Sequence, residues 1–396
     1  MITAHKFRLY PSKEIEDKML STLDLCRQTY NTLLGLLNKQ KEIDRSQIQG
    51  IIPDMKICDS IFKNLHSKTM QYECHRLFSN LRGLSESKGK RKIGRLRFKS
   101  KTRFKTFTYN QSGFRLTDTG KRFQTLWLSK IGNIPIRCHR GIKGKIKSIT
   151  VRRAPSGKWH ASIMAEQKIT VPKQKIDMDN IVGIDAGLID IAYDSDKKSI
   201  ANPRHLNKKA KKLGKLQRKM SKKKKGSNNM NKARIMVAGH YERLADARDD
   251  FLHKLSRYYV NKYDAIGFED FDISRFAKGN YLAKSMLDAS WGKLRQFVAY
   301  KAERAGKHYI TVNYKGTTQR CSQCGKYVTK DLHERMHKCP FCGFVAPRDY
   351  NSALEIKNLM IERIGQELSE YTLVEIEALL PLVATSVSEA RSPSLA

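Results

Sequence analysis

The sequence contains no apolar stretch that approaches 18 residues, the approximate length of a membrane-spanning helix. Its first six residues, Met1 to Lys6, also lack the pattern of a signal peptide. From these two absences we expect a soluble protein of the cytoplasm, and specifically of a prokaryotic cell. A chain of 396 residues is too long for one ordinary core, so we expect two or three packed units.

Acidic residues are scarce. The chain has 38 Asp and Glu residues against 77 Lys and Arg residues, which gives a formal net charge of +39. An imbalance of this size destabilises a compact state by self-repulsion unless a polyanion neutralises it. Nucleic acid, bound mainly through its phosphates, is therefore the expected partner. The alternative is a basic surface of the ribosomal or solubility type.

Between residues 87 and 153 there is a single acid, Asp118, among 21 basic residues. Alternating residues and frequent glycines in this stretch predict a strand-rich barrel. Aromatic side chains are interleaved with the charges, as on surfaces that bind single-stranded or structured nucleic acid. Alternatively, part of the aromatic set faces the barrel core. The set comprises Phe98, Phe104, Phe107, Tyr109, Phe114, Phe123 and Trp127.

A second stretch, residues 197–241, has 16 basic residues and no acid. Residues 205–220 have helical spacing, and four consecutive lysines follow at 222–225. A charge run is commonly a solvated face, but one without balancing acids repels itself as a free helix. We therefore interpret the helix over 204–225 as one that follows phosphates. Its candidate nucleic-acid contacts are Lys208, Lys212, Lys215, Arg218, Lys219 and Lys222.

Further elements follow from periodicity. Residues 2–10 read as a short strand, and residues 14–39 and 67–84 have apolar residues at helical spacing. The chain after residue 365 reverses its charge and ends in a stretch rich in Ser and Pro. We expect residues 367–396 to be a disordered tail.

The eight cysteines do not suggest a secreted disulfide framework, because four of them are scattered. The other four form two Cys-x-x-Cys pairs, Cys321 with Cys324 and Cys339 with Cys342. This spacing predicts one zinc ion held by four thiolates in a closed structural site, which does no chemistry itself. His333 and His337 lie between the pairs, and we expect them near the metal without binding it, or in solvent.

Three acidic positions follow elements that would bring them together. Asp185 ends the apolar run 180–184, and the acids at 269–270 end the apolar run 265–268. Asp349 precedes a helical pattern at 350–357. Singly, each acid is explained by a turn or a helix cap. Together, carboxylates at the end of a sheet suit a pair of Mg²⁺ or Mn²⁺ ions and predict phosphodiester hydrolysis.

With these motifs together, the chain resembles the TnpB family, RNA-guided DNA endonucleases encoded by bacterial and archaeal insertion sequences. It resembles more distantly the miniature type V CRISPR effectors. The resemblance covers nearly the whole chain. It is carried by 6–14, 27–31, 183–187, 268–270, 290–292, the two cysteine pairs and 348–351.

The resemblance implies an α/β multidomain protein. Its parts would be a ribonuclease-H-like (RuvC) nuclease domain with an inserted zinc ribbon, a β-barrel wedge domain and a helical recognition lobe. Residues 1–10 would supply the first wedge strand, 11–95 the recognition lobe and 96–178 the rest of the wedge. Residues 179–316 would form the nuclease domain, 317–347 the zinc-ribbon insert that binds target nucleic acid, and 348–366 the last nuclease helix.

The resemblance also assigns roles. Asp185, Glu269 and Asp349 would be the catalytic acids that bind two Mg²⁺ or Mn²⁺ ions. The partners would be a guide RNA derived from the transposon end and double-stranded target DNA that carries a short motif beside the target. The protein would be associated with the nucleoid. Alignment to the family places Gln71 and Thr108 at contacts to that motif. One departure is Pro347, which stands where the family often has an additional acid.

Three other functions remain open. The chain could be a miniature type V CRISPR effector nuclease, a nuclease-inactive RNA-guided regulator that occupies DNA, or a transposase that joins strands with the same acids. The three acids argue against the regulator.

Overall fold

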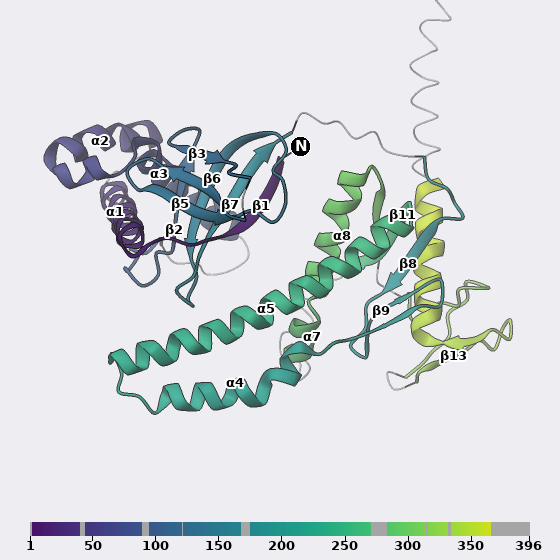
Figure 1. Cartoon of the computed structure of the whole chain (residues 1–396). Helices are drawn as coiled ribbons and strands as arrows, with labels where there is room; N and C mark the ends of the chain where they lie inside the picture. The colour runs from purple at the N-terminus through teal and green to yellow at the C-terminus, as the bar shows by residue number, and fades with distance from the viewer. Residues whose placement is uncertain are drawn as a thin grey trace, which may run out of the picture. The chain divides into compact units, whose positions relative to one another are not determined.

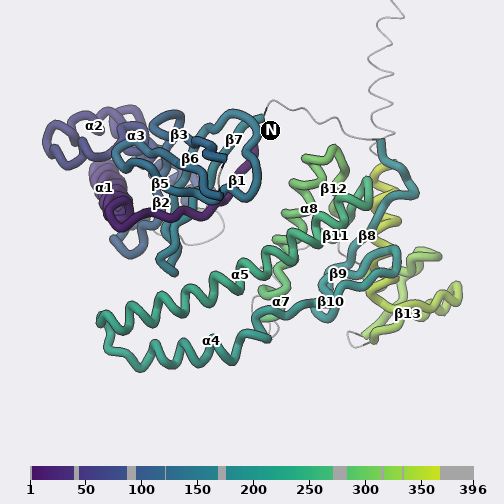
Figure 2. Tube along the Cα trace, viewed as in Figure 1, coloured from purple at the N-terminus to yellow at the C-terminus, as the bar shows by residue number. Residues whose placement is uncertain are grey.

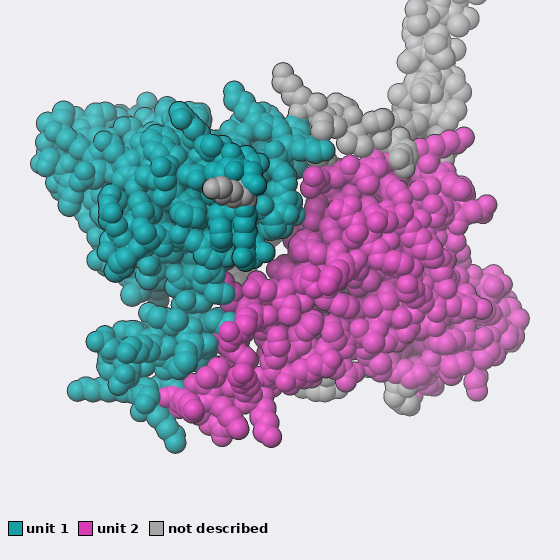
Figure 3. Space-filling model, viewed as in Figure 1, with its two compact units in different colours: residues 1–170, 220–239 teal, residues 171–219, 240–396 magenta. Residues whose placement is uncertain are grey.

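The computed structural model describes residues 2–39, 44–88, 95–120, 122–167, 175–270, 283–313, 316–331 and 334–365. The predicted tail at 367–396 and His333 lie outside these ranges. The chain forms two compact units (Figure 3). Unit 1 comprises residues 1–170 and 220–239, and unit 2 comprises residues 171–219 and 240–396.

Unit 1 contains a seven-stranded antiparallel sheet with the order β2-β6-β7-β1-β5-β4-β3. The predicted strand at the start of the chain is confirmed as β1, which lies at the centre of the sheet and pairs with β7 along its whole length. The sheet curves into a barrel-like shape (Figure 1). Its strands are β1 (Ile2–Leu9), β2 (Thr106–Asn110), β3 (Phe114–Thr117), β4 (Gln124–Leu128), β5 (Gly132–Arg137), β6 (Lys145–Arg153) and β7 (Trp159–Glu166).

The aromatic residues of this unit divide between core and surface. Phe104, Phe107 and Tyr109 are buried in the core, as the alternative interpretation of the aromatic set proposed. Phe98 and Trp127 instead expose 60% and 41% of their surface. The aromatic set therefore does not form one surface, and only its exposed members can meet a partner directly.

The helical segments described within the N-terminal part of unit 1 are α1 (Lys13–Leu37), α2 (Arg45–Cys58), the 3₁₀ helix η1 (Ser60–Asn64) and α3 (Ser67–Lys88). The two helices predicted from periodicity, α1 and α3, are confirmed. The Ser12 hydroxyl caps α1 by accepting a hydrogen bond from the backbone N–H of Ile15. Helix α2 was not predicted from the sequence; it carries Pro53 in its interior, a position where proline ordinarily disrupts a helix.

Unit 2 is built on a five-stranded sheet with the order β10-β9-β8-β11-β12 (Figure 2). Within this sheet, β8, β9 and β10 form an antiparallel meander. Strands β11 and β12 then run parallel to β8. The apolar run that Asp185 ends is a strand, β8, which pairs with β9 in antiparallel orientation. The strands are β8 (Ile181–Asp185), β9 (Asp190–Asp194), β10 (Ser199–Ala201), β11 (Ala265–Asp270) and β12 (His308–Asn313).

Helices cover both faces of this sheet. One face packs on the end of α5 (Asn228–Lys262) and on α8 (Trp291–Ala305), through residues that include Tyr259 and Leu294. The other face packs on a helix at 348–365, through Ile356, Met360 and Ile364. Unit 2 is therefore a helix–sheet–helix sandwich, which buries both faces of its parallel strands.

The remaining elements of unit 2 are α4 (His205–Ser221), the short α7 (Ala283–Ala289), and a hairpin of β13 (Met336–Lys338) and β14 (Val345–Pro347). The helix predicted at 205–220 is confirmed as α4, but the wider bounds 204–225 are wrong, because α4 ends at Ser221 and the lysines at 222–225 follow it in a turn. None of the helices in the described parts of the chain combines the length and hydropathy needed to cross a bilayer.

Candidate active site and zinc module

Asp185 is the last residue of β8, and the alternation of that strand fixes the direction of its side chain. Val182 and Ile184 pack in the core shared with α5 and α8. Because side chains alternate along a strand, Gly183 and Asp185 face the opposite side, toward the helix at 348–365. The apolar side chains on one face of β8 thus pack in the core, and the other face places the Asp185 carboxylate at the end of the strand.

Strand β11 repeats this arrangement beside β8. Ile266 and Phe268 pack in the same core, so Gly267 and Glu269 face the helix at 348–365. The two strands are parallel, and Gly267 is the direct partner of Gly183. Glu269 therefore emerges beside Asp185, because each acid lies two residues beyond one of the paired glycines.

The helix at 348–365 lies directly on both glycines. A Cβ atom added to Gly183 would lie 2.3 Å from the carbonyl oxygen of Ala353 and 2.6 Å from the backbone nitrogen of Lys357. One added to Gly267 would lie 1.8 Å from the sulfur of Met360. The absence of both side chains lets the helix approach the sheet closely.

This close approach brings the third acid to the other two. Asp349 lies in the first turn of the helix, four residues before Ala353, which corresponds to about 6 Å along the axis. Asp185 lies two residues beyond Gly183, which corresponds to about 6.6 Å along the strand. Helix and strand therefore carry their carboxylates to a similar height above the point where they cross.

The electrostatics agree with that placement. Burial, followed by the charges of Glu269 and Asp349, raises the pKa of Asp185 well above its ordinary value. Burial also raises the pKa of Glu269. The charges of Glu269 and Asp349 thus oppose the ionisation of Asp185, as expected where negative charges gather. Divalent cations bound by carboxylate oxygens would relieve that repulsion, so the donor set fits the predicted Mg²⁺ or Mn²⁺ ions.

Two residues that the sequence analysis did not single out orient Glu269. The hydroxyl of Thr317, which is buried, donates a hydrogen bond to the Glu269 carboxylate. Arg295 of α8 donates to the Glu269 carbonyl oxygen at 2.6 Å. Both lower the pKa of Glu269 against the effect of burial. No local motif marks either residue, because both contacts depend on the tertiary fold.

The four cysteine sulfurs come together as the spacing predicts. All lie within 4.8 Å of one another, with separations of 3.7 Å between Cys321 and Cys342 and 3.6 Å between Cys324 and Cys339. Tetrahedral zinc with bonds of about 2.3 Å requires sulfur–sulfur distances of about 3.8 Å. The cluster therefore fits a closed structural zinc site.

The two cysteine pairs share one backbone design. The N–H of Cys321 donates to the carbonyl of Lys326, and the N–H of Cys339 donates to that of Phe344. In each pair, the glycine after the second cysteine donates back to the first cysteine's carbonyl. These glycines, 325 and 343, have φ of 72° and 74°, a conformation that glycine adopts without strain. The pattern Cys-x-x-Cys-Gly is thus the complete local signal.

His337 is not among the four ligands. It is fully buried, and its Nδ1 lies within hydrogen-bonding distance of the Lys330 ammonium. Burial lowers the pKa of His337, and the charge of Lys330 lowers it further. This buried position agrees with the expectation that His337 lies near the metal without binding it. It does not agree with the alternative expectation that His337 lies in solvent.

A polar stripe on the helix at 348–365 holds the first cysteine pair. Asn351, which is buried, accepts from the N–H of Ser322 at 3.0 Å and donates to the carbonyl of Arg320 at 2.8 Å. One and two turns later, Glu355 forms an ion pair with Arg320 at 3.0 Å and Asn358 donates to the Ser322 carbonyl at 2.8 Å. The helix that carries Asp349 therefore also anchors the zinc module.

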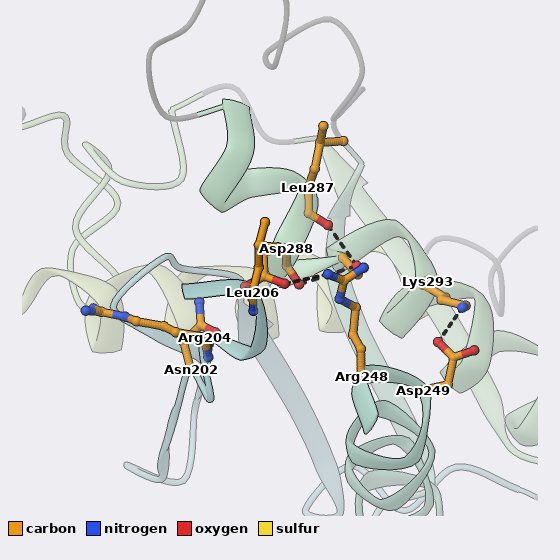
Figure 4. A network of polar contacts seen from close by, with 9 residues as sticks. Asn202, Arg204, Leu206, Arg248, Asp249, Leu287, Asp288 and Lys293 are labelled. Atoms are coloured by element: carbon orange, nitrogen blue, oxygen red, sulfur yellow. Dashed lines mark hydrogen bonds and ion pairs between the residues drawn. The ribbon is translucent and has the colours of Figure 1, made fainter. Parts of the chain in front are cut away.

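The start of the basic helix α4 is anchored to α7 and α5 through Asp288 of α7 (Figure 4). The Asp288 carboxylate accepts from the backbone N–H of Leu206, in the first turn of α4, at 3.0 Å. It also accepts from Arg248 of α5 at 2.5 Å. A negative charge at this end of a helix is favourable. Sequence periodicity gives no indication of this contact, which joins three helices.

The six basic residues proposed as contacts on and beside α4 are all exposed. Lys208, Lys212, Lys215 and Lys219 follow one another at helical intervals of three or four, so they form one stripe. Such a row of like charges destabilises an isolated helix, which agrees with a helix that meets phosphates.

The two residues aligned with motif contacts differ in exposure. Gln71 of α3 is partly exposed. Thr108 of β2 is 1% exposed, and its hydroxyl lies 3.0 Å from that of Thr150 on the neighbouring strand. Of the two, only Gln71 presents surface that a nucleic acid can reach without a rearrangement of the sheet.

Three family models match different parts of the chain. A family described as "Probable transposase" matches residues 164–279, and the target-nucleic-acid-binding (TNB) domain of Cas12f1-like proteins matches residues 291–356. A model described as a helix-turn-helix domain matches residues 1–42. In this structure the described part of that last range contains one strand followed by one long helix, β1 and α1.

Two curated relatives match almost end to end. A protein of Streptomyces pristinaespiralis, named as a candidate RNA-guided DNA endonuclease, is 28% identical over 89% of this chain and 88% of its own length. The protein InsQ of Escherichia coli K12, named in the same way, is 28% identical over 90% of this chain and 91% of its own length.

Solved structures share the fold at low sequence identity. Cas12f1, solved by cryo-EM with a single-guide RNA and target DNA, superposes with a TM-score of 0.59 at 13% identity, covering 90% of this chain and 98% of Cas12f1. The mini-RNA-guided endonuclease Cas-phi3 gives a TM-score of 0.52 at 8% identity, with 91% and 92% coverage.

Proposed function

We propose that this chain, a relative of the TnpB proteins of insertion sequences, is an RNA-guided, divalent-metal-dependent DNA endonuclease. It binds a guide RNA derived from a transposon end, recognises a short motif beside its target, and cleaves both DNA strands with one RuvC site. The observation that carries the proposal is the close packing of the helix at 348–365 on Gly183 and Gly267, which brings Asp185, Glu269 and Asp349 to one end of the unit 2 sheet; the raised pKa of Asp185 supports it.

The topology of unit 2 supports a ribonuclease-H-like nuclease domain. That fold requires three antiparallel strands in sequence, followed by two strands parallel to the first. The sheet of unit 2 has this arrangement, with the order β10-β9-β8-β11-β12. The end-to-end match to two relatives named as RNA-guided DNA endonucleases supports the activity. The fold shared with Cas12f1 supports the same architecture.

The roles of the residues follow from their positions. The carboxylates of Asp185, Glu269 and Asp349 would hold two Mg²⁺ or Mn²⁺ ions, with Thr317 and Arg295 fixing the orientation of Glu269. When bound, such ions activate a water and stabilise the leaving oxygen of the phosphodiester. The zinc module would present single-stranded DNA to the acids, because the helix that carries Asp349 also anchors that module.

The remaining parts bind nucleic acid. The barrel-like sheet of unit 1 would serve as the wedge domain (1–10 and 96–178), and the helices at 11–95 as the recognition lobe. The stripe on α4 would track the guide RNA or the heteroduplex backbone. Base pairing between guide and target then supplies sequence specificity, while the protein reads a short motif. Gln71 is the proposed motif contact. We expect the protein to act at the nucleoid, in the cytoplasm.

A miniature type V CRISPR effector is the second candidate, favoured by the match of residues 291–356 to the Cas12f1-like TNB domain. The two nucleases differ in the source of the guide RNA. Sequencing the RNA that copurifies with the protein distinguishes them, because a transposon-end sequence supports the first function and a repeat–spacer transcript the second.

The proposal is tested by plasmid cleavage. Protein purified at low salt, with its copurified RNA and Mg²⁺, is expected to linearise a plasmid that carries the guide-matched target and its adjacent motif. The variants Asp185→Ala, Glu269→Ala and Asp349→Ala are expected to lose cleavage by about 10³-fold or more while binding RNA and target as before. Binding without cleavage by the unaltered protein would favour a regulator. Joined ends formed without RNA would favour a transposase.

A further inference from the structure

Unit 1 contains an irregular basic segment to which the proposed function assigns no specific contact. Residues 95–105 form neither a helix nor a strand between α3 and β2. Every second residue in this segment is basic, and none is acidic. The six basic residues are Arg95, Arg97, Lys99, Lys101, Arg103 and Lys105. The backbone turns at residues 100–104, where the N–H groups of Arg103 and Phe104 donate to the carbonyl of Ser100, so the segment gathers its positive charge within a short, bent stretch of chain.

The segment is held in place by helix α1. The side chain of Asn31 donates to the carbonyl of Lys99 at 3.0 Å and accepts from its N–H at 2.8 Å. A Cβ atom added to Gly35 would lie 3.9 Å from Cε1 of Phe98, so the ring of Phe98 also rests beside this helix. These contacts give the segment a fixed course in spite of its irregular backbone.

Beside the segment is an open hollow of about 520 Å³. This volume is within the range of about 300–1,000 Å³ that small-molecule sites occupy. Among the described residues that line it, none is acidic and six are basic. The six are Arg76, Arg95, Arg97, Lys99, Arg103 and Lys105.

One wall of the hollow is preorganised. Arg76 of α3 donates to the carbonyl of Thr106 at 3.1 Å and to its hydroxyl at 3.0 Å. Its guanidinium lies 5.1 Å from the centre of the Phe104 ring, and it pairs with buried Glu73 at 3.1 Å. Arg76 is therefore fixed in one orientation. The other five cations lie in the segment 95–105.

Phe98 also lines this hollow, and it exposes 60% of its surface. One exposed aromatic residue is ordinary by itself. Here the ring lies among cations in a hollow that is large enough for one nucleotide. That combination is the one that proteins use for single-stranded nucleic acid, in which a base stacks on an aromatic ring while cations hold the phosphates.

We propose that this hollow binds one unpaired nucleotide, with its base stacked on Phe98 and its phosphates held by the basic residues of segment 95–105. The site rests on the proposed function, since the nucleotide would belong to the guide RNA or to an unpaired stretch of DNA. Both share the chemistry of a phosphate and a base, and the test separates them.

The experiment measures the binding of a fluorescein-labelled hexanucleotide, as RNA and as DNA of the same sequence, by anisotropy. It uses the full chain freed of RNA at high salt, with no divalent metal present. Phe98→Ala is expected to weaken binding by about 5- to 100-fold, with the salt dependence unchanged, because it removes stacking and no charge. Arg97→Gln is expected to reduce the salt slope by about 0.7.

Two variants serve as controls. Phe98→Tyr keeps the ring and is expected to bind within twofold of the unaltered protein. Trp127→Ala removes the other exposed aromatic of the original set, which lies outside the hollow, and is expected to have no effect. An effect of Phe98→Ala on RNA alone assigns the site to the guide, and an effect on DNA alone assigns it to the target.

The proposal would be overturned if Phe98→Ala bound both probes within twofold of the unaltered protein. It would also be overturned if Trp127→Ala lost as much affinity as Phe98→Ala. Thermal unfolding of each variant shows whether a loss of affinity reflects a loss of fold, and the Tyr variant decides the question in that case. The assay contains no metal and measures no cleavage. A failure of the nuclease proposal therefore leaves its result intact.

Discussion

Gly183 and Gly267 are direct partners on two parallel strands, and the helix that carries Asp349 lies on both of them. Each glycine precedes an acid of the candidate site by two residues. The pair therefore sets the distance between the sheet and the helix, and with it the spacing of the three carboxylates. Close packing and the proposed chemistry depend on the same two positions.

The first prediction concerns Gly183→Ala. A methyl group there meets backbone atoms of the helix, which cannot turn aside as a side chain can. We expect the free energy of unfolding to fall by about 3 kcal/mol. Displacement of Asp349 is expected to lower the cleavage rate by about 10²-fold. Urea unfolding and plasmid cleavage measure the two effects.

The matched control is Gly214→Ala, a glycine of α4 with open space around it. Alanine there is expected to stabilise the helix by about 0.5 to 1 kcal/mol, because it lowers the entropy of the unfolded chain. If Gly183→Ala were as well tolerated as Gly214→Ala, the close packing of helix on sheet would not be what positions Asp349.

The sequence reveals the local parts of this site. The apolar runs 180–184 and 265–268 predict two buried strands that end in acids, and spacing alone predicts the zinc cluster. The repeated pattern of glycine, apolar residue and acid at 183–185 and 267–269 was also readable. However, this pattern indicates a crossing helix only once the register of the two strands is known, because the register places the two glycines side by side.

Contacts between distant elements were not predictable. Thr317 reaches Glu269 and Asp288 reaches the start of α4 only through the tertiary fold. Helix α2 was missed because Pro53 is a poor helix former. Thr108, aligned with a nucleic-acid contact, is buried, although alternation along β2 places it on the face opposite the core residues Phe107 and Tyr109.

The second prediction concerns zinc. The protein is expected to contain one zinc ion per chain, and Cys321→Ser is expected to lose it. Loss of the module should release Thr317 from Glu269, abolish cleavage in excess Mg²⁺ and leave RNA binding in place. Metal analysis by mass spectrometry and the plasmid assay check this. Cys58→Ser, an exposed cysteine outside the cluster, is the control and should keep both zinc and activity.

The third prediction concerns the anchor of the zinc module. Asn351→Ala removes two hydrogen bonds from partly buried backbone groups and should lower the free energy of unfolding by about 2 kcal/mol. Cleavage should fall with it, because the module and Asp349 share one helix. Asn358→Ala removes one such bond and should cost about 1 kcal/mol. Equal effects of the two variants would argue against Asn351 as the main anchor.

The fourth prediction concerns pH. Burial and the neighbouring acids raise the pKa of Asp185 in the folded protein above its ordinary value of 3.8. The folded state thus holds a proton that the unfolded chain releases, so metal-free stability should fall as pH rises from about 4 through the raised pKa. Mg²⁺ should remove that loss, and Asp185→Asn should flatten it. Melting temperature against pH, with and without Mg²⁺, measures both.

Asp196 supplies a control of opposite sign. Against the effect of burial, hydrogen bonds from Tyr263 and Lys262 lower its pKa. Its contribution to stability is therefore present above its ordinary pKa and is lost as pH falls through the lowered value. Asp196→Asn should weaken the protein at neutral pH, with or without Mg²⁺. An Asp185→Asn variant that behaved in the same way would contradict the account of a crowded acidic site.

The most direct test of the central claim is anomalous X-ray scattering from Mn²⁺ in crystals of the protein with its RNA and target DNA. We predict two manganese ions about 4 Å apart, with carboxylate oxygens of Asp185, Glu269 and Asp349 as ligands. Manganese bound elsewhere, or a site in which one of these three carboxylates touches neither ion, would contradict the claim that they form a two-metal nuclease centre.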